Sequence, residues 1–229
     1  MHLTCQGGMR GRGDSTRDHA YLQPMHFDFA TMPGPDRYRL MASAITPRPI
    51  AWVVTQSAGG VRNAAPYSFF NMMGADPPIV AIGMMRRADG THKDSAQNLI
   101  DTGQFVVHLV SESDAPAMNL TCIDAPPQVD ELDLAGIATV PSLAVAPPRI
   151  ASAPVAMECR VHGLHEIGTT TLVIGEVLHF HVDDRFWDPA TRRIDTPAMQ
   201  LVGRVHGAGW YARGTDLFEL VRPVWQAER

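Results

Sequence analysis

Residues 169–181, TTTLVIGEVLHFH, are the stretch of this sequence that decides its fold. β-Branched and aromatic side chains dominate the stretch, and these residue types fit the pleated, half-buried surface of a β-sheet. The stretch is therefore predicted to be a long strand. Its neighbours in the sheet can be sought on both sides along the chain.

Two further strands precede it in the middle of the chain. Residues 155–163 form a second long strand, which is joined to 169–181 near Glu166-Ile167-Gly168. Residues 105–110, FVVHLV, are a short apolar run typical of a buried strand.

Three more strands are predicted in the N-terminal half of the chain. Residues 50–55, IAWVVT, form a buried strand, and the turn residues SAGG at 57–60 connect it to 61–65 as a hairpin. Residues 79–84, IVAIGM, form another buried strand. It opens after Pro77-Pro78, where the missing amide donors matter least.

Helices are expected in two places. Residues 91–102 are predicted to be helical, with Asp94 or Ser95 as the cap and Gly103 as a stop signal. Residues 112–121 are predicted to form a second short helix.

Residues 123–154 contain six prolines and little periodicity. We expect a long irregular excursion around a short acidic turn, DELD at 130–133. A loop of this length inside a compact domain is usually either functional or disordered.

The pattern as a whole indicates a mainly β protein with a few helices. No helix alternates regularly with the strands, which disfavours a doubly wound α/β sheet and favours a closed or nearly closed barrel. Residues 25–229 are expected to form one domain. Residues 1–24 lack apolar periodicity and are expected to be a flexible N-terminal tail.

Composition narrows the classes of partner. The chain has 229 residues, of which 45% are hydrophobic and 19% charged, and its net charge is −5. It has no long basic run, so neither nucleic acid nor an anionic membrane has electrostatic support as a partner. The three cysteines show no CxxC spacing, which favours free thiols and a cytoplasmic location.

Several catalytic and metal-binding patterns are missing from the sequence. It contains no GxxxxGK[ST] phosphate loop, no GxGxxG between a strand and a helix, and no GxSxG elbow. His179 and His181 share one face of a strand, but no carboxylate or thiol at helpful spacing completes a metal site. We therefore expect structural or solvent-facing histidines and no metal.

One region is dense in groups that could bind a flat, anionic ligand. Arg48 and Lys93 are cations next to rigid or capping positions. Short hydrogen-bonding side chains and adjacent aromatics complete the region: Ser68, Phe69, Phe70, Asn71, Ser95 and Asn98. Cations and helix amides suit a phosphate, and apolar walls suit a ring. The residues alone are equally compatible with a surface cluster of turn residues.

These segments resemble the flavin reductase-like family of FMN-binding split barrels, which includes flavoredoxin-type proteins and the reductase partners of two-component oxygenases. The matching motifs follow in order: RPIAWVVT, NAAPYSFFN, KDSxxN, FVVHLV, ELDLAGI, IGEVLHFHVDD and GRVHGAGWY. The order and spacing hold from about residue 38 to residue 223. The resemblance implies a mainly β, Greek-key-like split barrel.

The resemblance also implies a homodimer with FMN in a groove between subunits, and NADH or NADPH as the electron donor. Its motifs place the following residues around the flavin: Arg48, Thr55, Tyr67, Ser68, Phe69, Phe70, Asn71, Lys93, Asp94, Ser95, Asn98 and Tyr211. Lys93, Asp94 and Ser95 are expected at the phosphate end, with Asn98 nearby. Arg204 and His206 match a C-terminal segment that closes over the flavin.

The expected function is an NAD(P)H-dependent flavin reductase that could supply a partner oxygenase. Hydride transfer is the chemistry of the cofactor, so binding residues are expected and no side-chain catalyst. Two alternatives stay open at this point. One is an FMN-carrying redox protein without its own pyridine-nucleotide activity, and the other is a related oxidase acting on a small molecule.

Overall fold

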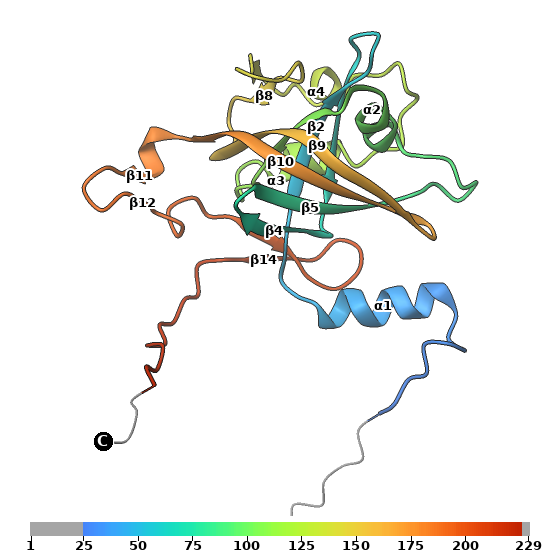
Figure 1. The fold of residues 1–229 in the computed structure, drawn as a ribbon, viewed down its shortest axis with the longest axis horizontal. Coiled ribbons are helices and arrows are strands. Elements are labelled where there is room, and N and C mark those ends of the chain that lie inside the picture. Colours follow the sequence, from blue (N-terminus) through green and yellow to red (C-terminus); the bar gives the residue numbers. More distant parts are fainter. Residues whose placement is uncertain (1–24, 226–229) are drawn as a thin grey trace, which may run out of the picture.

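The computed structural model describes residues 25–225, and the expected N-terminal tail at 1–24 lies outside them. Seven strands form one antiparallel sheet in the order β3-β2-β6-β9-β10-β5-β4 (Figure 1). Their bounds are β2 Ala51–Gln56, β3 Arg62–Tyr67, β4 Phe70–Ala75, β5 Pro78–Met85, β6 Gln104–His108, β9 Val155–Ile167 and β10 Thr170–Val182. The mainly β prediction is confirmed.

The hairpin β9–β10 lies at the centre of the sheet and is its longest pair of strands (Figure 1). Residues 170–175 of β10 alternate between half-buried and buried, as expected for a strand with one face on the core. At the bulge beside Gly175, a Cβ atom would lie 2.3 Å from Cζ of the fully buried Phe105. Glycine at this position therefore lets the Phe105 ring pack directly against β10.

Strand β2 is buried on both faces because two separate cores cover it. Val53 belongs to a cluster that contains Phe105, whereas Trp52 and Val54 belong to a second cluster that contains Leu132. The second cluster lies beneath helix α3 (Ala115–Leu120) and helix α4 (Glu131–Leu134). A strand buried on both faces reads as a continuous apolar run, and this is why residues 50–55 were predictable.

Helix α2 (Asp94–Thr102) connects β5 to β6, which lie on opposite sides of the central hairpin. Its predicted stop is confirmed, since Gly103 ends it in the left-handed conformation at φ 69°. The helix begins at Asp94, three residues later than predicted. Thr91 belongs to a preceding turn, in which its amide and hydroxyl both donate to the Asp89 carboxylate.

The excursion at 123–154 has an ordered path, and it contains α4, β7 (Thr139–Val140) and β8 (Arg149–Ile150). Side chains of the central sheet anchor its backbone. The buried carboxylate of Glu158 accepts hydrogen bonds from the amides of Leu143 (2.8 Å) and Ala144 (2.6 Å). It also lies 2.8 Å from Nε2 of His181, so this histidine has a structural partner. Of the two expected outcomes for the excursion, disorder is excluded.

Several elements were not predicted from the sequence. They are α1 (Gly34–Ala44), β4, β1 (Arg48–Pro49), β13 (Val202–Arg204), β14 (Tyr211–Arg213), β11 (Trp187–Asp188), β12 (Arg193–Ile194) and the turn η1 (Asp184–Phe186). Helix α1 buries only Ala42, and β4 is largely exposed, so neither carries a clear apolar period. The second predicted helix is shorter than expected, because Ser111 bonds to the Asp114 carboxylate in a turn that precedes α3.

The sheet does not close through backbone hydrogen bonds, because β3 and β4 remain as its edges. A small sheet of β1, β13 and β14 lies beside it and joins residues near the two ends of the described chain. Within residues 25–225, no helix has the length and apolar character required to cross a membrane.

The buried imidazole of His108 should make the stability of the folded chain depend on pH. The buried imidazole donates from Nδ1 to the Trp52 carbonyl and accepts at Nε2 from the Ile150 amide, each at 2.9 Å, so it is held neutral. Burial lowers its pKa from 6.5 to about 4. Between these values the unfolded chain binds a proton that the folded chain excludes. Stability should therefore fall by about 3 kcal/mol as the pH drops from 6.5 to 4.

Denaturant unfolding between pH 6.5 and 5, above the titration of most carboxylates, measures this effect. His108→Gln can keep both hydrogen bonds but cannot titrate, so the slope of stability against pH should flatten. An NMR titration of the wild type should find the His108 imidazole unprotonated down to pH 5. Protonation of that ring near pH 6.5 in the folded protein contradicts the assignment.

Candidate functional site

Three adjoining cavities surround the end of β3. The α2 cavity, which Asp94 and Ser95 of α2 line, has a volume of about 220 Å³. The Phe69 cavity, named after one of its lining residues, has a volume of about 240 Å³. The arginine cavity, which Arg48 and Arg204 line, has a volume of about 190 Å³. Pro66 and Tyr67 line all three. Lys93 lines the α2 and Phe69 cavities, whereas Cys122 lines the α2 and arginine cavities. The three cavities therefore form a continuous candidate site around Tyr67.

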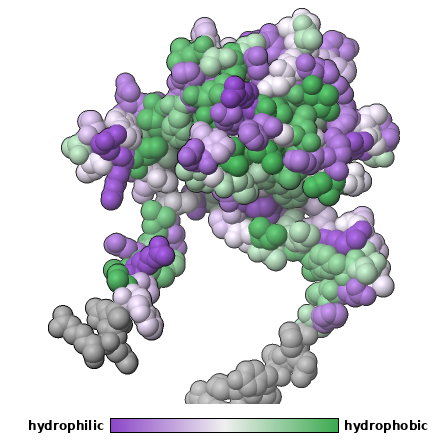
Figure 2. Space-filling view, in the orientation of Figure 1, coloured by the Kyte–Doolittle hydropathy of each residue, from purple (hydrophilic) through white to green (hydrophobic). Residues whose placement is uncertain are grey.

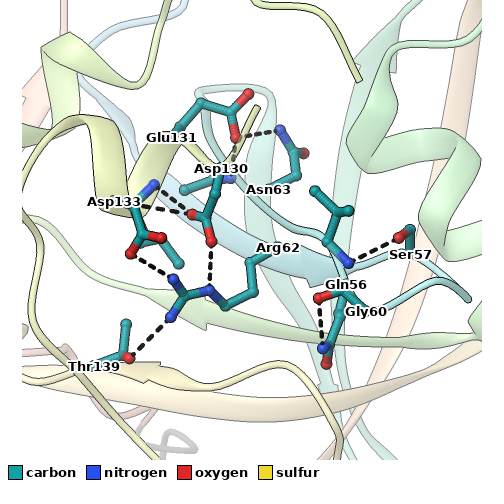
Figure 3. A network of polar contacts seen from close by, with 12 residues as sticks. Gln56, Ser57, Gly60, Arg62, Asn63, Asp130, Glu131, Asp133 and Thr139 are labelled. Atoms are coloured by element: carbon teal, nitrogen blue, oxygen red, sulfur yellow. Dashed lines mark hydrogen bonds and ion pairs between the residues drawn. The ribbon is translucent and has the colours of Figure 1, made fainter. Parts of the chain in front are cut away.

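The floor of the α2 cavity is built by a buried carboxylate. Oε2 of Glu131 accepts hydrogen bonds from Nδ2 of Asn63 (2.9 Å) and from the amide of Ala64 (3.1 Å) (Figure 3). Asn63 and Ala64 belong to β3, whereas Glu131 is the first residue of α4. This contact joins the excursion to the sheet at the site.

The orientation of the Asn63 amide follows from this contact. An ionised carboxylate only accepts hydrogen bonds, so the amide nitrogen must face Glu131 and the amide oxygen must face the other way. Oδ1 of Asn63 then accepts a hydrogen bond from the Ser95 hydroxyl at 2.6 Å. The Ser95 hydroxyl proton is thereby committed to the protein, and its backbone amide is the donor that remains for a ligand.

Thr55 and Asn98 lie beneath this network and line none of the three cavities. Nδ2 of Asn98 donates to the Thr55 hydroxyl at 3.0 Å, and Thr55 is fully buried. The two residues support Asn63 and α2 from below. The structure therefore places them behind the residues that line the site.

The N-terminus of α2 opens into the α2 cavity. Lys93 is its N-cap residue, and its side chain makes no capping hydrogen bond. Within the described residues, the amides of Asp94, Ser95 and Ala96 have no hydrogen-bond acceptor. Free first-turn amides and the positive end of the helix dipole favour an anion at this position.

Lys93 is the only lysine among 229 residues, where 18 of the 19 basic side chains are arginine. Within the described residues its ammonium forms no ion pair, although Asp94 and Asp124 line the same cavity. Arg87 instead bonds to Asp94 (2.8 Å) and to the His92 carbonyl. Arg87 thus fixes the segment that leads into α2, and Lys93 stays available to a ligand.

Ion pairs hold α4 against the outer end of β3. Arg62 donates to Asp130 and to Asp133, each at 2.6 Å (Figure 3). Asp130 also caps α4, because its carboxylate accepts from the amide of Leu132 at 2.9 Å. The predicted acidic turn at 130–133 is therefore a short capped helix whose carboxylates bind β3.

Tyr67 presents a neutral hydroxyl within the site. Burial raises its pKa to about 12. Its oxygen is buried and has no hydrogen-bond partner within the described residues. A buried hydroxyl without a partner is costly, so a ligand that accepts its proton would be stabilised.

The side chain of Arg48 ties three segments together. Its guanidinium donates to the carbonyls of Ala42, Ile45 (2.8 Å) and His206 (3.0 Å), and weakly to the Ser68 hydroxyl at 3.5 Å. It therefore fixes the end of α1 and the loop before β14. Arg48 and Ser68 both line the arginine cavity.

The aromatic pair separates, as expected for neighbouring residues of extended chain. Phe70 packs against the core cluster, whereas Phe69 lies 6.2 Å from the Tyr38 ring between ring centroids and lines the Phe69 cavity. Phe70 and the exposed Asn71 line only a fourth, larger cavity of about 480 Å³ beside α1. Neither residue lines the α2 cavity.

The C-terminal hairpin closes the arginine cavity. The Arg204 guanidinium lies 4.8 Å above the Tyr211 ring and donates from Nη1 to the Tyr211 hydroxyl at 2.6 Å. Both residues line the arginine cavity, which His206 does not line. Of the C-terminal residues considered, Arg204 and Tyr211 thus contribute side chains, and His206 contributes a carbonyl to Arg48.

Ten of the twelve residues proposed from the sequence line one of the four cavities; Thr55 and Asn98 do not. The sequence-based set omitted Asn63, Glu131, Arg87, Cys122, Pro66 and Tyr38. Asn63 belongs to a motif that was quoted, and the lone lysine is a signal that was available. Glu131 is 68 residues from Asn63 along the chain, and no local pattern reveals that contact.

Comparisons with known proteins show the family of the chain. Residues 41–193 match the family described as flavin reductase like domain. A protein of Deinococcus radiodurans is 44% identical over 211 residues, which cover 89% of this chain and 93% of that protein.

Solved structures extend the likeness to the fold. Nitrilotriacetate monooxygenase component B from Bacillus cereus is 32% identical, with a TM-score of 0.82 over 87% of this chain and 100% of that chain. A protein with a split barrel domain from Shewanella frigidimarina is 19% identical, with a TM-score of 0.73 over 87% of this chain and 100% of that chain. The split-barrel prediction is confirmed.

Glu131 provides a test of how the site is built. Glu131→Ala leaves the Asn63 side chain and the Ala64 amide without an acceptor, and each loss costs about 1–3 kcal/mol. The free energy of unfolding should therefore fall by about 2–6 kcal/mol in denaturant titrations. Glu131→Gln retains an acceptor oxygen and should lose less.

Asp133→Ala is the matched control on the same helix. Its carboxylate is 76% exposed and pairs with Arg62 at the surface, so its removal should cost less than about 1 kcal/mol. Equal losses for Glu131→Ala and Asp133→Ala would show that the buried network does not hold the excursion.

Proposed function

Because the chain belongs to the flavin reductase-like family, we propose that it binds FMN and transfers electrons from NADH or NADPH to flavin. The observation that carries the proposal is the uncapped N-terminus of α2, which opens with the lone Lys93 into the α2 cavity. Membership of the family supports flavin reductase activity in general. The proposal adds FMN as the flavin, NADH or NADPH as the electron donor, and a role for each residue.

The phosphate of FMN fits the α2 cavity on chemical grounds. The free amides of Asp94, Ser95 and Ala96 are donors, and the Lys93 ammonium supplies a full positive charge. Asp94, Asp124 and Glu131 also line this cavity; Asp94 pairs with Arg87, and Glu131 accepts two hydrogen bonds from β3. The phosphate would therefore meet donors on the α2 side and a neutral amide, Asn63, on the β3 side.

The isoalloxazine ring fits the Phe69 cavity, which Lys93 joins to the α2 cavity. Its walls are apolar or aromatic on several sides and include Tyr38, Pro66, Phe69 and Met85. Flat cofactors are held by such walls together with a few polar groups that fix their orientation. Ser68 and the backbone around it would supply those polar groups.

The bound flavin would supply the hydride chemistry, which needs no acid or base from a side chain. The residues of this chain would bind and orient the ring and keep water from it. The neutral Tyr67 hydroxyl can donate one hydrogen bond within the site without adding charge. No catalytic side chain is assigned, in keeping with this division of roles.

The proposal includes a homodimer in the cytoplasm. Apolar side chains remain exposed along α1 and β4, among them Met41, Ile45, Met72 and Met73. Figure 2 shows apolar surface on α1 and on the extended C-terminal segment, both of which project from the body of the protein. A second copy of the chain would cover such surface.

The similarity to a monooxygenase component supports a place in a two-component system. In such a system, this chain would pass reduced flavin to a partner oxygenase. A protein that only carries FMN is the competing function. The activity assay below separates it from a reductase.

The test is FMN binding followed by nucleotide oxidation. Purified protein should bind FMN, and added NADH or NADPH should be oxidised in proportion to enzyme. Lys93→Ala should weaken FMN binding at least tenfold through the lost phosphate contact, about 1.4 kcal/mol. Lys93→Arg keeps the charge and should bind FMN better than Lys93→Ala.

The outcomes are distinct. FMN binding without nucleotide oxidation would leave the carrier function and end the reductase proposal. If Lys93→Ala binds FMN with wild-type affinity, the phosphate does not bind at the N-terminus of α2. A chain that ignores FMN would end both proposals.

A further inference from the structure

The arginine cavity differs from the α2 cavity in the charge of the residues that line it. Two guanidinium groups, those of Arg48 and Arg204, line it, and no carboxylate does. The α2 cavity, by contrast, contains Asp94, Asp124 and Glu131 among its lining residues. Within the described residues, neither Arg48 nor Arg204 forms an ion pair. Two unpaired cations thus meet in one hollow of a chain whose net charge is −5.

Arg204 is held ready for a ligand. Its Nε donates to the Gly207 carbonyl at 3.0 Å and its Nη1 donates to the Tyr211 hydroxyl at 2.6 Å, while the Tyr211 ring supports its plane. Within the described residues, Nη2 makes no hydrogen bond. A planar guanidinium with fixed orientation and free donors is suited to an oxyanion.

Arg48 contributes a second positive charge to the cavity, and its side chain is fixed in place. Only 6% of the residue is exposed, and backbone carbonyls hold its donors in place. Carbonyl dipoles satisfy those donors but do not cancel the full charge, and a buried charge without a counter-ion is costly. An anion in the cavity would offset that cost.

The size and walls of the cavity define the rest of the ligand. Its volume of about 190 Å³ suits a compact molecule, and the rings of Tyr38, Tyr67 and Tyr211 line it. Aromatic walls favour a flat, apolar body. The cavity also shares Tyr38, Pro66, Tyr67 and Ser68 with the Phe69 cavity, where the flavin ring is proposed.

We propose that the arginine cavity binds the carboxylate of a small aromatic acid, with Arg204 as its principal ligand and its ring beside the flavin. The proposal deepens the substrate class of the flavin reductase and rests on that proposed function. The same positive charge could attract the phosphates of a nicotinamide dinucleotide. A single carboxylate on a flat body matches the compact cavity better.

Isothermal titration calorimetry of the FMN-loaded protein with benzoate tests this site. Benzoate should bind, and benzamide, which has nearly the same shape without the charge, should bind at least tenfold more weakly. Arg204→Gln should weaken benzoate at least tenfold, a larger loss than it causes for FMN. Arg213→Gln is the matched control, because Arg213 lies in the same hairpin, pairs with Glu112 and does not line the cavity.

In protein that binds FMN, each other outcome overturns the proposal. Benzoate that fails to bind a protein that binds FMN, or binds no better than benzamide, removes the carboxylate site and leaves the reductase intact. If Arg204→Gln instead raises KM for NADH tenfold with no benzoate binding, the cavity belongs to the nucleotide. If it weakens FMN tenfold, the cavity belongs to the flavin. Failure of the wild type to bind FMN is the separate failure of the proposed function.

Discussion

The side chain of Asn63 lies between a carboxylate and a hydroxyl, and its two ends cannot be exchanged. Its nitrogen donates to Glu131 and its oxygen accepts from Ser95, so one amide joins β3, α4 and α2. These three elements form the α2 cavity. Loss of the Glu131 contact would release the excursion, and loss of the Ser95 contact would release the start of α2. The geometry of the candidate site therefore depends on this network.

The same network decides which donors face a ligand. Because the Ser95 hydroxyl is committed to Asn63, the backbone amides of α2 are left for an anion. Arg87 holds the preceding segment through Asp94, which leaves Lys93 as the cation at the cavity. The proposed phosphate site thus combines a helix N-terminus with a point charge, and the arginine cavity adds a planar group for a second, flatter anion.

Local sequence signals predicted the buried strands and the stop of α2, because a continuous apolar run or a glycine in the left-handed conformation is a local property. They missed α1 and β4, whose faces are largely exposed and carry no clear apolar period. For the candidate site, Lys93 was proposed from its charge and position and Tyr67 from the family resemblance, whereas Glu131 was missed. Glu131 acts through its contact with Asn63, which is 68 residues away along the chain. The periodicity of a local stretch of sequence carries no information about such a contact.

Amine-reactive labelling followed by mass spectrometry tests the central claim most directly, since Lys93 is the only lysine in the chain. The account predicts that FMN slows labelling of Lys93 at least tenfold and that riboflavin, which lacks the phosphate, protects it far less. A lysine-containing peptide added to the sample serves as an internal reference whose rate should not change. Labelling of Lys93 at an unchanged rate in protein saturated with FMN would contradict the account.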